Sequence, residues 1–294
     1  MTMEATRSHH VAILSSAVLW GLIGVFVKNL VAAGLGSYEI VGIRAIFSAI
    51  ILVVAMLCYD RTALRIRWQD CWYFVGTGML SMVFFNYCYF TAMQVSSISV
   101  AVALLYTAPV FVMLFSAVLF KEKLTLIKII AALLTFGGCV LVTGMFADAP
   151  EVSFYGALLG IGSGIGYALY SIFGKYALQR YGSLTITMYT FIFGSIGIIP
   201  FMDWGKSFTA ITKSEVWLFG LGIAILCSVL PYFLYTYGLN EIEAGKAAVM
   251  ATVEPLVAAA LGIIFFNEDL GFSKAIGMVL IIFAVILLNR HSKV

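Results

Sequence analysis

The sequence has 294 residues, of which 63% are hydrophobic and only 11% are charged, and its mean hydropathy is +1.06. A soluble domain has about 45–50% apolar and about 25% charged residues, so most of the surface of this chain requires lipid as its solvent. The net charge of +3 is too small to indicate a nucleic-acid partner. Composition therefore predicts a membrane protein that is embedded in the lipid bilayer.

Long apolar runs follow one another along the chain, most of them with short connections. A membrane-spanning helix needs about 20 mainly apolar residues. Runs of this kind cover residues 11–33, 37–58, 70–93, 97–120, 125–146, 154–178, 183–201, 214–239, 243–266 and 272–289. The longest and most polar connections are Tyr59–Gln69 and Met202–Lys213. The pattern predicts an all-α membrane protein with ten transmembrane helices.

The lysines and arginines are distributed unequally between the two sides of this arrangement. With a cytoplasmic N-terminus, the outer segments contain only Lys206, Lys213 and Lys274. The inner segments contain Arg7, Arg61, Arg65, Arg67, Lys121, Lys123, Lys128, Lys175, Arg180, Lys246, Arg290 and Lys293. Cytoplasmic loops carry the excess of positive charge. We therefore expect a multi-pass protein of the cell inner (cytoplasmic) membrane with both termini in the cytoplasm.

The chain repeats itself at an offset of about 147 residues. The alignment pairs Trp20 with Tyr167, Lys28 with Lys175, Pro109 with Pro255, and Phe-Lys-Glu-Lys-Leu (120–124) with Phe-Asn-Glu-Asp-Leu (266–270). It divides the chain into repeats 1–147 and 148–294. Each repeat has five spans, an odd number, so the two repeats must have opposite topology. Inverted repeats of this kind are typical of alternating-access transporters.

Four stretches carry a resemblance to a known family. They are Leu-Trp-Gly (19–21), Arg44, Tyr-Thr-Ala-Pro-Val-Phe…Phe-Lys-Glu-Lys-Leu (106–124) and Val-Glu-Pro-Leu-Val…Phe-Asn-Glu-Asp-Leu (253–270). Over essentially its whole length the chain resembles the ten-helix, EamA-type members of the drug/metabolite transporter superfamily. The resemblance implies export of amino acids and related metabolites through a central cavity lined by the first four helices of each half. It also implies that the fifth helix of each half lies to the side.

Glu254 is the acid expected nearest to the middle of the membrane, next to the helix-loosening Pro255. An ionisable residue at that depth costs about 2.5–3.5 kcal/mol on insertion scales, so it needs a reason to be there. Three roles stay open: a proton-coupling carboxylate, a counter-ion for a substrate amine, or a group that hydrogen-bonds neighbouring helices. Its repeat partner is Ala108, so the predicted site has a single acid.

Three basic residues lie within or at the ends of spans. Arg44, about two turns into the second span, is either a ligand for a substrate carboxylate or a structural residue. Pairing with Glu39, five residues earlier, is geometrically poor. Lys28 and Lys175 occupy matched places near the ends of their helices, where snorkelling toward the lipid headgroups is expected.

Aromatic side chains complete the predicted substrate site. Helical phase and the repeat alignment favour one set of inward-facing residues over those that face lipid. The predicted substrate-binding residues are Trp20, Asn86, Tyr106, Tyr167, Tyr170, Tyr232, Tyr235 and Glu254. An aromatic cavity with one acid and one amide suits an amphipathic zwitterion or an organic cation.

A secondary transporter of a small molecule is the function these features favour. No phosphate-binding P-loop motif occurs, and no cofactor, metal site or catalytic residue is predicted. The histidines, His9, His10 and His291, fall outside the apolar runs, and the five cysteines show no C-x-x-C spacing. The transporter is expected to be proton-coupled or an exchanger. An importer or facilitator of an organic cation such as a quaternary amine is the alternative, and a membrane-embedded enzyme is disfavoured. A monomer is expected, with a dimer left open.

Overall fold

The structure, a computed structural model, describes residues 3–144, 153–266 and 271–290. Its first half contains α1 (Met3–Gly21), α2 (Ile23–Ala32), α3 (Ser37–Tyr59), η1 (Arg61–Leu64), η2 (Trp68–Asp70), α4 (Cys71–Phe74), η3 (Val75–Val83), α5 (Phe84–Val95), α6 (Ile98–Leu105), α7 (Ala108–Phe120) and α8 (Leu126–Thr143). Its second half contains α9 (Phe154–Ala177), α10 (Ser183–Ile198), η4 (Ile199–Phe201), α11 (Trp204–Ala210), α12 (Ser214–Ala224), η5 (Ile225–Val229), α13 (Leu230–Glu241), α14 (Ala244–Ala251), α15 (Val253–Phe266) and α16 (Phe272–Arg290).

The helices group into membrane spans that follow the predicted runs. Among the described residues, nine helical stretches are long and apolar enough to cross a membrane. The predicted span 70–93 is not among these nine, and it corresponds to the continuous helical stretch from Cys71 to Val95, formed by α4, η3 and α5. This stretch is less apolar because it contains Asn86 together with several tyrosines and glycines. The boundary predicted between residues 147 and 148 lies outside the described residues.

Irregular turns occur at matching places in the two halves. The third span contains a π-helical segment, η3, and the corresponding span of the second half contains another, η5. The next span is interrupted in both halves, between α6 and α7 at Tyr106–Thr107 and between α14 and α15 at Thr252. Wide turns and breaks of this kind inside a helix commonly mark functional sites. The internal repeat of the sequence is therefore also a repeat of backbone irregularities.

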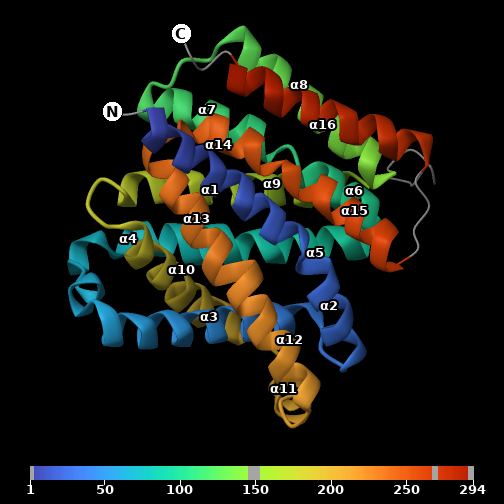
Figure 1. The fold of residues 1–294 in the computed structure, drawn as a ribbon. Coiled ribbons are helices and arrows are strands. Elements are labelled where there is room, and N and C mark those ends of the chain that lie inside the picture. Colours follow the sequence, from blue (N-terminus) through green and yellow to red (C-terminus); the bar gives the residue numbers. More distant parts are fainter. Residues whose placement is uncertain (1–2, 145–152, 267–270, 291–294) are drawn as a thin grey trace.

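The fifth helix of each half lies at one side of the bundle. Figure 1 shows α8 and α16 side by side above the other helices. Gly138 and Gly277 allow this contact, because a Cβ on Gly138 would lie 2.8 Å from the Gly277 carbonyl oxygen. Small residues permit such close helix approach in membranes. The remaining helices surround the centre of the molecule, as the family resemblance implied.

Two regions differ from the sequence-based expectations. Helix α1 begins at Met3, well before residue 11, so His9 lies inside a helix and is buried, with only 7% of its surface exposed. His9 is outside the apolar runs of the sequence, but the helix extends beyond the run and buries it. Its ring stacks on Tyr237 at 4.4 Å and its Nδ1 lies 3.1 Å from the Tyr237 carbonyl oxygen. The connection Met202–Lys213 contains the short helix α11, with Trp204 and Phe208 exposed on it.

Candidate substrate cavity

A partly open cavity of about 430 Å³ lies between the two halves of the chain. This volume is near the lower end of the usual range for small-molecule sites, about 300–1,000 Å³. All nine residues singled out by the sequence line it, namely Trp20, Arg44, Asn86, Tyr106, Tyr167, Tyr170, Tyr232, Tyr235 and Glu254. The structure thus brings every predicted site residue together, whereas their contact with a substrate stays a prediction.

Trp20 lies at the centre of the aromatic wall. Its ring centroid is 5.4 Å from those of Tyr232 and Tyr235 and 6.4 Å from that of Tyr167. Phe85, a lining residue that the sequence pattern did not select, contacts Tyr167 at 6.0 Å. These edge-to-face and tilted contacts fix the rings relative to one another. The wall is therefore a rigid surface contributed by both halves.

Two tyrosines form the floor of the cavity through hydrogen bonds between helices α9 and α13. The Tyr170 hydroxyl lies 2.6 Å from Thr236 Oγ1, and the Tyr235 hydroxyl lies 2.7 Å from Ser171 Oγ. Tyr235 is almost fully buried, with 1% of its surface exposed. Because both hydroxyls are already bonded within the protein, these residues support the cavity through their rings and their packing.

Glu254 lies in the first turn of α15, directly after the break at Thr252. The N-terminal end of a helix favours negative charge. Gly21, at the end of α1, lets this helix approach closely, because a Cβ there would lie only 2.6 Å from Val257 Cβ. The Tyr167 side chain is within reach of the carboxylate. The break and the small residue together place one acid beside the aromatic wall.

Arg44 and Asn86 contribute the other polar groups. The Arg44 side chain, on α3, is buried, and its Nε has no hydrogen-bond partner. The ion pairs of the described residues do not include one between Arg44 and Glu39, which the sequence disfavoured. Glu39 Oε1 instead accepts a hydrogen bond of 2.8 Å from the Asp203 backbone N–H. Asn86 donates from Nδ2 to the Met82 carbonyl oxygen at 2.6 Å. Part of its amide is therefore occupied by its own helix.

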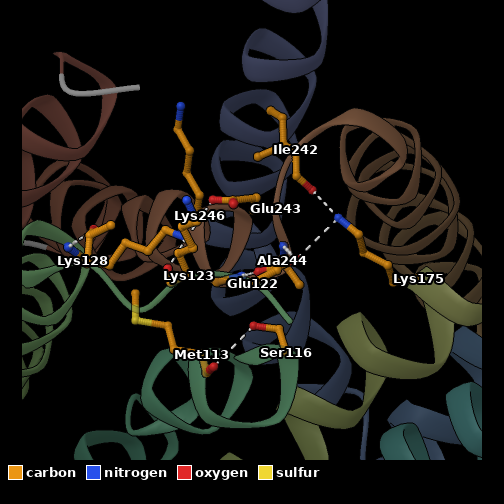
Figure 2. Close-up of polar contacts among 12 residues, drawn as sticks. Met113, Ser116, Glu122, Lys123, Lys128, Lys175, Ile242, Glu243, Ala244 and Lys246 are labelled. Atoms are coloured by element: carbon orange, nitrogen blue, oxygen red, sulfur yellow. Dashed lines mark hydrogen bonds and ion pairs between the residues drawn. The ribbon is translucent and has the colours of Figure 1, made fainter. Parts of the chain in front are cut away.

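Ion pairs close the end of the bundle that the cavity does not reach. The lining residues extend to Ser37 at the start of α3 and Met93 near the end of α5, which is the opposite end. Figure 2 shows the Glu122 carboxylate between Ala244 and Lys175. It accepts a hydrogen bond of 2.9 Å from the Ala244 N–H and lies 3.5 Å from Lys175 Nζ. Lys175 also donates to the Ile242 carbonyl oxygen at 2.9 Å.

The local backbone explains the position of Glu122. Lys121 adopts the left-handed conformation with φ of 57°, which ends α7 and directs the next residue toward α14. Helix α14 has no side-chain cap of its own at Glu243. The Glu122 carboxylate takes this role from the other half of the chain, where it satisfies free N–H groups and complements the helix dipole.

Further polar contacts surround this pair, as Figure 2 also shows. Lys128 Nζ lies 2.6 Å from Glu243 Oε2 and donates to the Lys123 carbonyl oxygen at 2.7 Å. We call Glu122, Lys128, Lys175, Glu243 and the N-terminus of α14 the Glu122 network. Next to it, the buried Lys246 lies with Nζ 2.6 Å from His10 Nε2.

A second polar cluster joins the two halves at the connection before the third span. Asp70 is buried and accepts hydrogen bonds of 2.7 Å from both Arg180 and the Tyr181 hydroxyl. The Tyr181 hydroxyl also accepts one from the Arg67 backbone N–H at 3.0 Å. The Tyr181 hydrogen bond, and next the Arg180 guanidinium, keep the pKa of Asp70 below its usual value of 3.8.

Sequence reasoning missed the Glu122 network. Lys175 was expected to snorkel toward the headgroups, and this expectation is wrong because its ammonium group pairs with Glu122. At the level of sequence, Lys128 was used only in a count of positive charges and Glu122 only as part of a repeated motif. The alternation Lys-Glu-Lys at 121–123, matched to Lys175 at the end of another span, was the signal that could have suggested an ion pair.

The comparisons with known proteins agree with this architecture. The model of the EamA-like transporter family matches residues 7–144 and again residues 154–290. An uncharacterized transporter of Archaeoglobus fulgidus is 28% identical over 97% of both chains. The threonine/homoserine exporter RhtA of Salmonella typhimurium is 29% identical over 65% of this chain and 62% of its own. A solved crystal structure with 17% identity has a TM-score of 0.79 over 98% of this chain and 99% of the other.

Fold and cavity define a multi-spanning membrane transporter built from two five-helix repeats. The double match shows further that the chain belongs to the EamA-like transporter family, within the drug/metabolite transporter superfamily. This result confirms the predicted family and fold class. The match to the solved structure supports the fold alone.

Proposed function

We propose that this protein exports small amphipathic metabolites, above all amino acids and related compounds, across the cell inner membrane by alternating access. The observation that carries the proposal is a cavity between two repeats that is partly open while ion pairs close one end of the bundle. Alternating-access transporters hold their substrate at such a repeat interface. RhtA, named a threonine/homoserine exporter, supports amino acids as the class of cargo.

Charge distribution supports the orientation. The Glu122 network lies where the sequence concentrates lysines, so by the positive-inside rule its end of the bundle faces the cytoplasm. Both termini are then cytoplasmic, and the cavity in this conformation is directed toward the outside. For an exporter, this is the state from which cargo is released.

The Glu122 network supports a gating role. Loading from the cytoplasm requires α14 to separate from the loop after α7, because Glu122 joins them. That separation exposes the first N–H groups of α14 and the ammonium group of Lys175 to water, which can replace the lost bonds. The network thus holds the inner end closed without being irreversible, as a gate requires.

Coupling of transport to protons or to substrate exchange is compatible with the ionisable residues that line the cavity. Glu254 is the acid among the cavity-lining residues, so a proton-coupled cycle has one carboxylate on which to operate. If Glu254 carries the proton and does not bind the cargo, Glu254→Gln keeps substrate binding and abolishes acceleration by a pH gradient. An exchanger instead shows no response to the gradient in the wild type.

Import or facilitated passage of an organic cation is the second candidate. It is favoured by one specific observation, that Glu254 lines the same cavity as the rings of Trp20, Tyr106 and Tyr167. A carboxylate within an aromatic wall is suited to a quaternary ammonium group. Strong uptake of choline with little movement of amino acids or of the zwitterion betaine would favour this candidate.

The test is a transport assay with purified protein in liposomes. The panel contains the labelled common amino acids, choline, betaine and a sugar phosphate as a negative control, each with and without a pH gradient. We expect amino acids with uncharged side chains to move fastest, and we expect protein-free liposomes to show no such movement. Failure of every compound to move above that background would overturn the proposal.

A further inference from the structure

Arg44 is a buried cation that lacks a protein carboxylate. It lines the cavity with 8% of its surface exposed, and its buried Nε has no hydrogen-bond partner. The ion pairs of the described residues involve Lys128, Lys175, Arg180 and Lys206 and do not include Arg44. A guanidinium has five donors arranged to hold a carboxylate through two parallel hydrogen bonds.

The neighbours of Arg44 do not supply that carboxylate. Glu39, five residues earlier on α3, instead accepts a hydrogen bond from the Asp203 backbone N–H. Ser48, on the same helix, uses its hydroxyl to donate to the Arg44 carbonyl oxygen at 2.7 Å, a bond that leaves the guanidinium untouched. An arginine at the centre of a spanning helix costs about 2.5–3.5 kcal/mol on insertion scales, and a buried guanidinium about two turns into a span also needs a reason to be there. Glu254 lines the same cavity and is near enough to act on Arg44 electrostatically, but the ion pairs of the described residues do not join the two, so the position of a directly bonded carboxylate is open to a ligand that enters the cavity.

Glu254 is the opposite pole of the same cavity. It comes from α15 in the second repeat, whereas Arg44 comes from α3 in the first. The four ion pairs found among the described residues do not include it either. Its carboxylate is within hydrogen-bond reach of Tyr167, whose ring contacts that of Trp20, and aromatic rings present negative faces that attract an ammonium group. The two charges therefore line one space without neutralising each other by direct contact.

We infer that the cavity recognises its cargo as a zwitterion held between the two repeats. The carboxylate of the cargo binds Arg44, its ammonium group binds Glu254, and its uncharged side chain contacts the wall formed by Phe85, Phe90 and Met93. This inference rests on the proposed export function and adds the role of each charged residue in holding the cargo. Because each repeat supplies one pole, the bound zwitterion links the repeats, whereas an amine or an acid alone engages only one.

A competition experiment tests the two poles separately. The labelled probe is the amino acid that the liposome panel transports fastest, bound to purified protein in detergent. Two competitors are derived from it, the amine that lacks the carboxylate and the acid that lacks the amino group. In the wild type, we expect the amino acid to bind at least about tenfold more tightly than either competitor, as loss of a charged hydrogen-bonding partner implies.

The variants should show a crossed pattern. Arg44→Gln should weaken amino-acid binding at least about tenfold and leave binding of the amine within twofold of wild type. Glu254→Gln should weaken it similarly and leave binding of the acid within twofold. Lys206→Gln and Glu215→Gln, which remove exposed charges outside the cavity, are the matched controls. They should leave binding of the amino acid, the amine and the acid unchanged. Arg44→Lys keeps the charge and should retain the preference for the amino acid over the amine.

Several results would overturn the inference. Equal weakening of amino acid, amine and acid in both variants would assign the two charges to the fold, as would unchanged binding of all three. If Arg44→Gln does not fold, as judged by thermal unfolding, the wild-type ranking together with Arg44→Lys and Glu254→Gln still decides the question. If the liposome panel moves choline or another non-zwitterion and no amino acid, the inference fails while the transporter function stands. If nothing moves, the proposed function itself fails.

Discussion

The charges in the centre of this protein and those at its closed end have the same chemistry but different surroundings. At the closed end, Glu122 and Lys128 both have protein partners within ion-pair distance. In the cavity, neither Arg44 nor Glu254 appears among the ion pairs of the described residues. A buried charge with an oppositely charged partner holds two segments together, whereas one that faces a cavity without an ion-pair partner is poised to bind a ligand.

The difference follows from which elements supply the charges. The Glu122 network connects loop residues and helix termini. Free N–H and C=O groups are already present there, and a charged side chain can satisfy several of them at once. Of the cavity charges, Arg44 extends from the side of α3 and Glu254 from the first turn of α15, and the ion pairs of the described residues include neither of them. Partner availability, more than depth, separates a latch from a binding site.

The largest stability effect is expected at Glu122. Glu122→Gln removes the negative charge between Lys175 and the N-terminus of α14, and breaking one side of a buried pair costs about 3–5 kcal/mol. Because the Lys175 side chain is partly exposed, we expect about 3 kcal/mol at most. Thermal unfolding in detergent measures this change. Glu241→Gln, in the exposed last turn of α13, is the matched control and should change stability by less than about 0.5 kcal/mol.

The same variant tests whether the network is a gate. A single cysteine at position 248, in a protein from which the native cysteines have been removed, reports on access from the closed end, since Ala248 is buried within α14. We expect Glu122→Gln to increase its labelling by a membrane-impermeant thiol reagent applied from that side. Unchanged labelling together with lower stability would make the network a structural clamp only.

The next effect concerns pH. The folded protein holds the pKa of Asp70 below its usual 3.8, chiefly through the Tyr181 hydrogen bond, so the unfolded chain takes up this proton first as the pH falls. The stabilisation is complete above that value and is lost as the pH falls through the lower, folded pKa. Asp70→Asn should therefore lower the unfolding temperature at pH 6, and the two proteins should converge once the pH is below the lowered pKa of Asp70 in the folded protein. A difference that persists at low pH would show that packing, and not charge, explains the contribution of Asp70.

Much of this arrangement could be predicted from the sequence. The spans follow from apolar length alone, and the repeat by itself pairs Trp20 with Tyr167 across the two halves. The nine cavity residues were accessible because a polar or aromatic side chain in a span is conspicuous against aliphatic neighbours. Pairings such as Glu122 with Ala244 were not, because bringing together residues 122 positions apart depends on tertiary packing. His9 was missed because an apolar threshold places the helix start after it.

A smaller effect is expected in the cavity floor. Tyr235→Phe keeps the buried ring and removes only the hydroxyl that bonds Ser171, a neutral hydrogen bond worth about 1 kcal/mol. Tyr237→Phe removes a hydroxyl from a more exposed tyrosine on the same helix and serves as the control. We expect Tyr235→Phe to lower the unfolding free energy by about 1 kcal/mol and to change substrate affinity less than twofold. A tenfold loss of affinity would instead show that the Tyr235 hydroxyl contacts the substrate.

The smallest effect is expected at Glu243, and it sharpens the comparison from within the network. Glu243 pairs with Lys128, but its own side chain is 49% exposed, so water screens the attraction and replaces it when it is lost. Lys128 also keeps its hydrogen bond to the Lys123 carbonyl oxygen. Glu243→Gln should therefore cost about 0.5 kcal/mol and leave the labelling at position 248 close to the wild-type level. A loss of stability as large as that of Glu122→Gln would mean that the network acts as one cooperative unit. A double variant of Glu122 and Glu243 would then show a strongly non-additive change in the unfolding free energy.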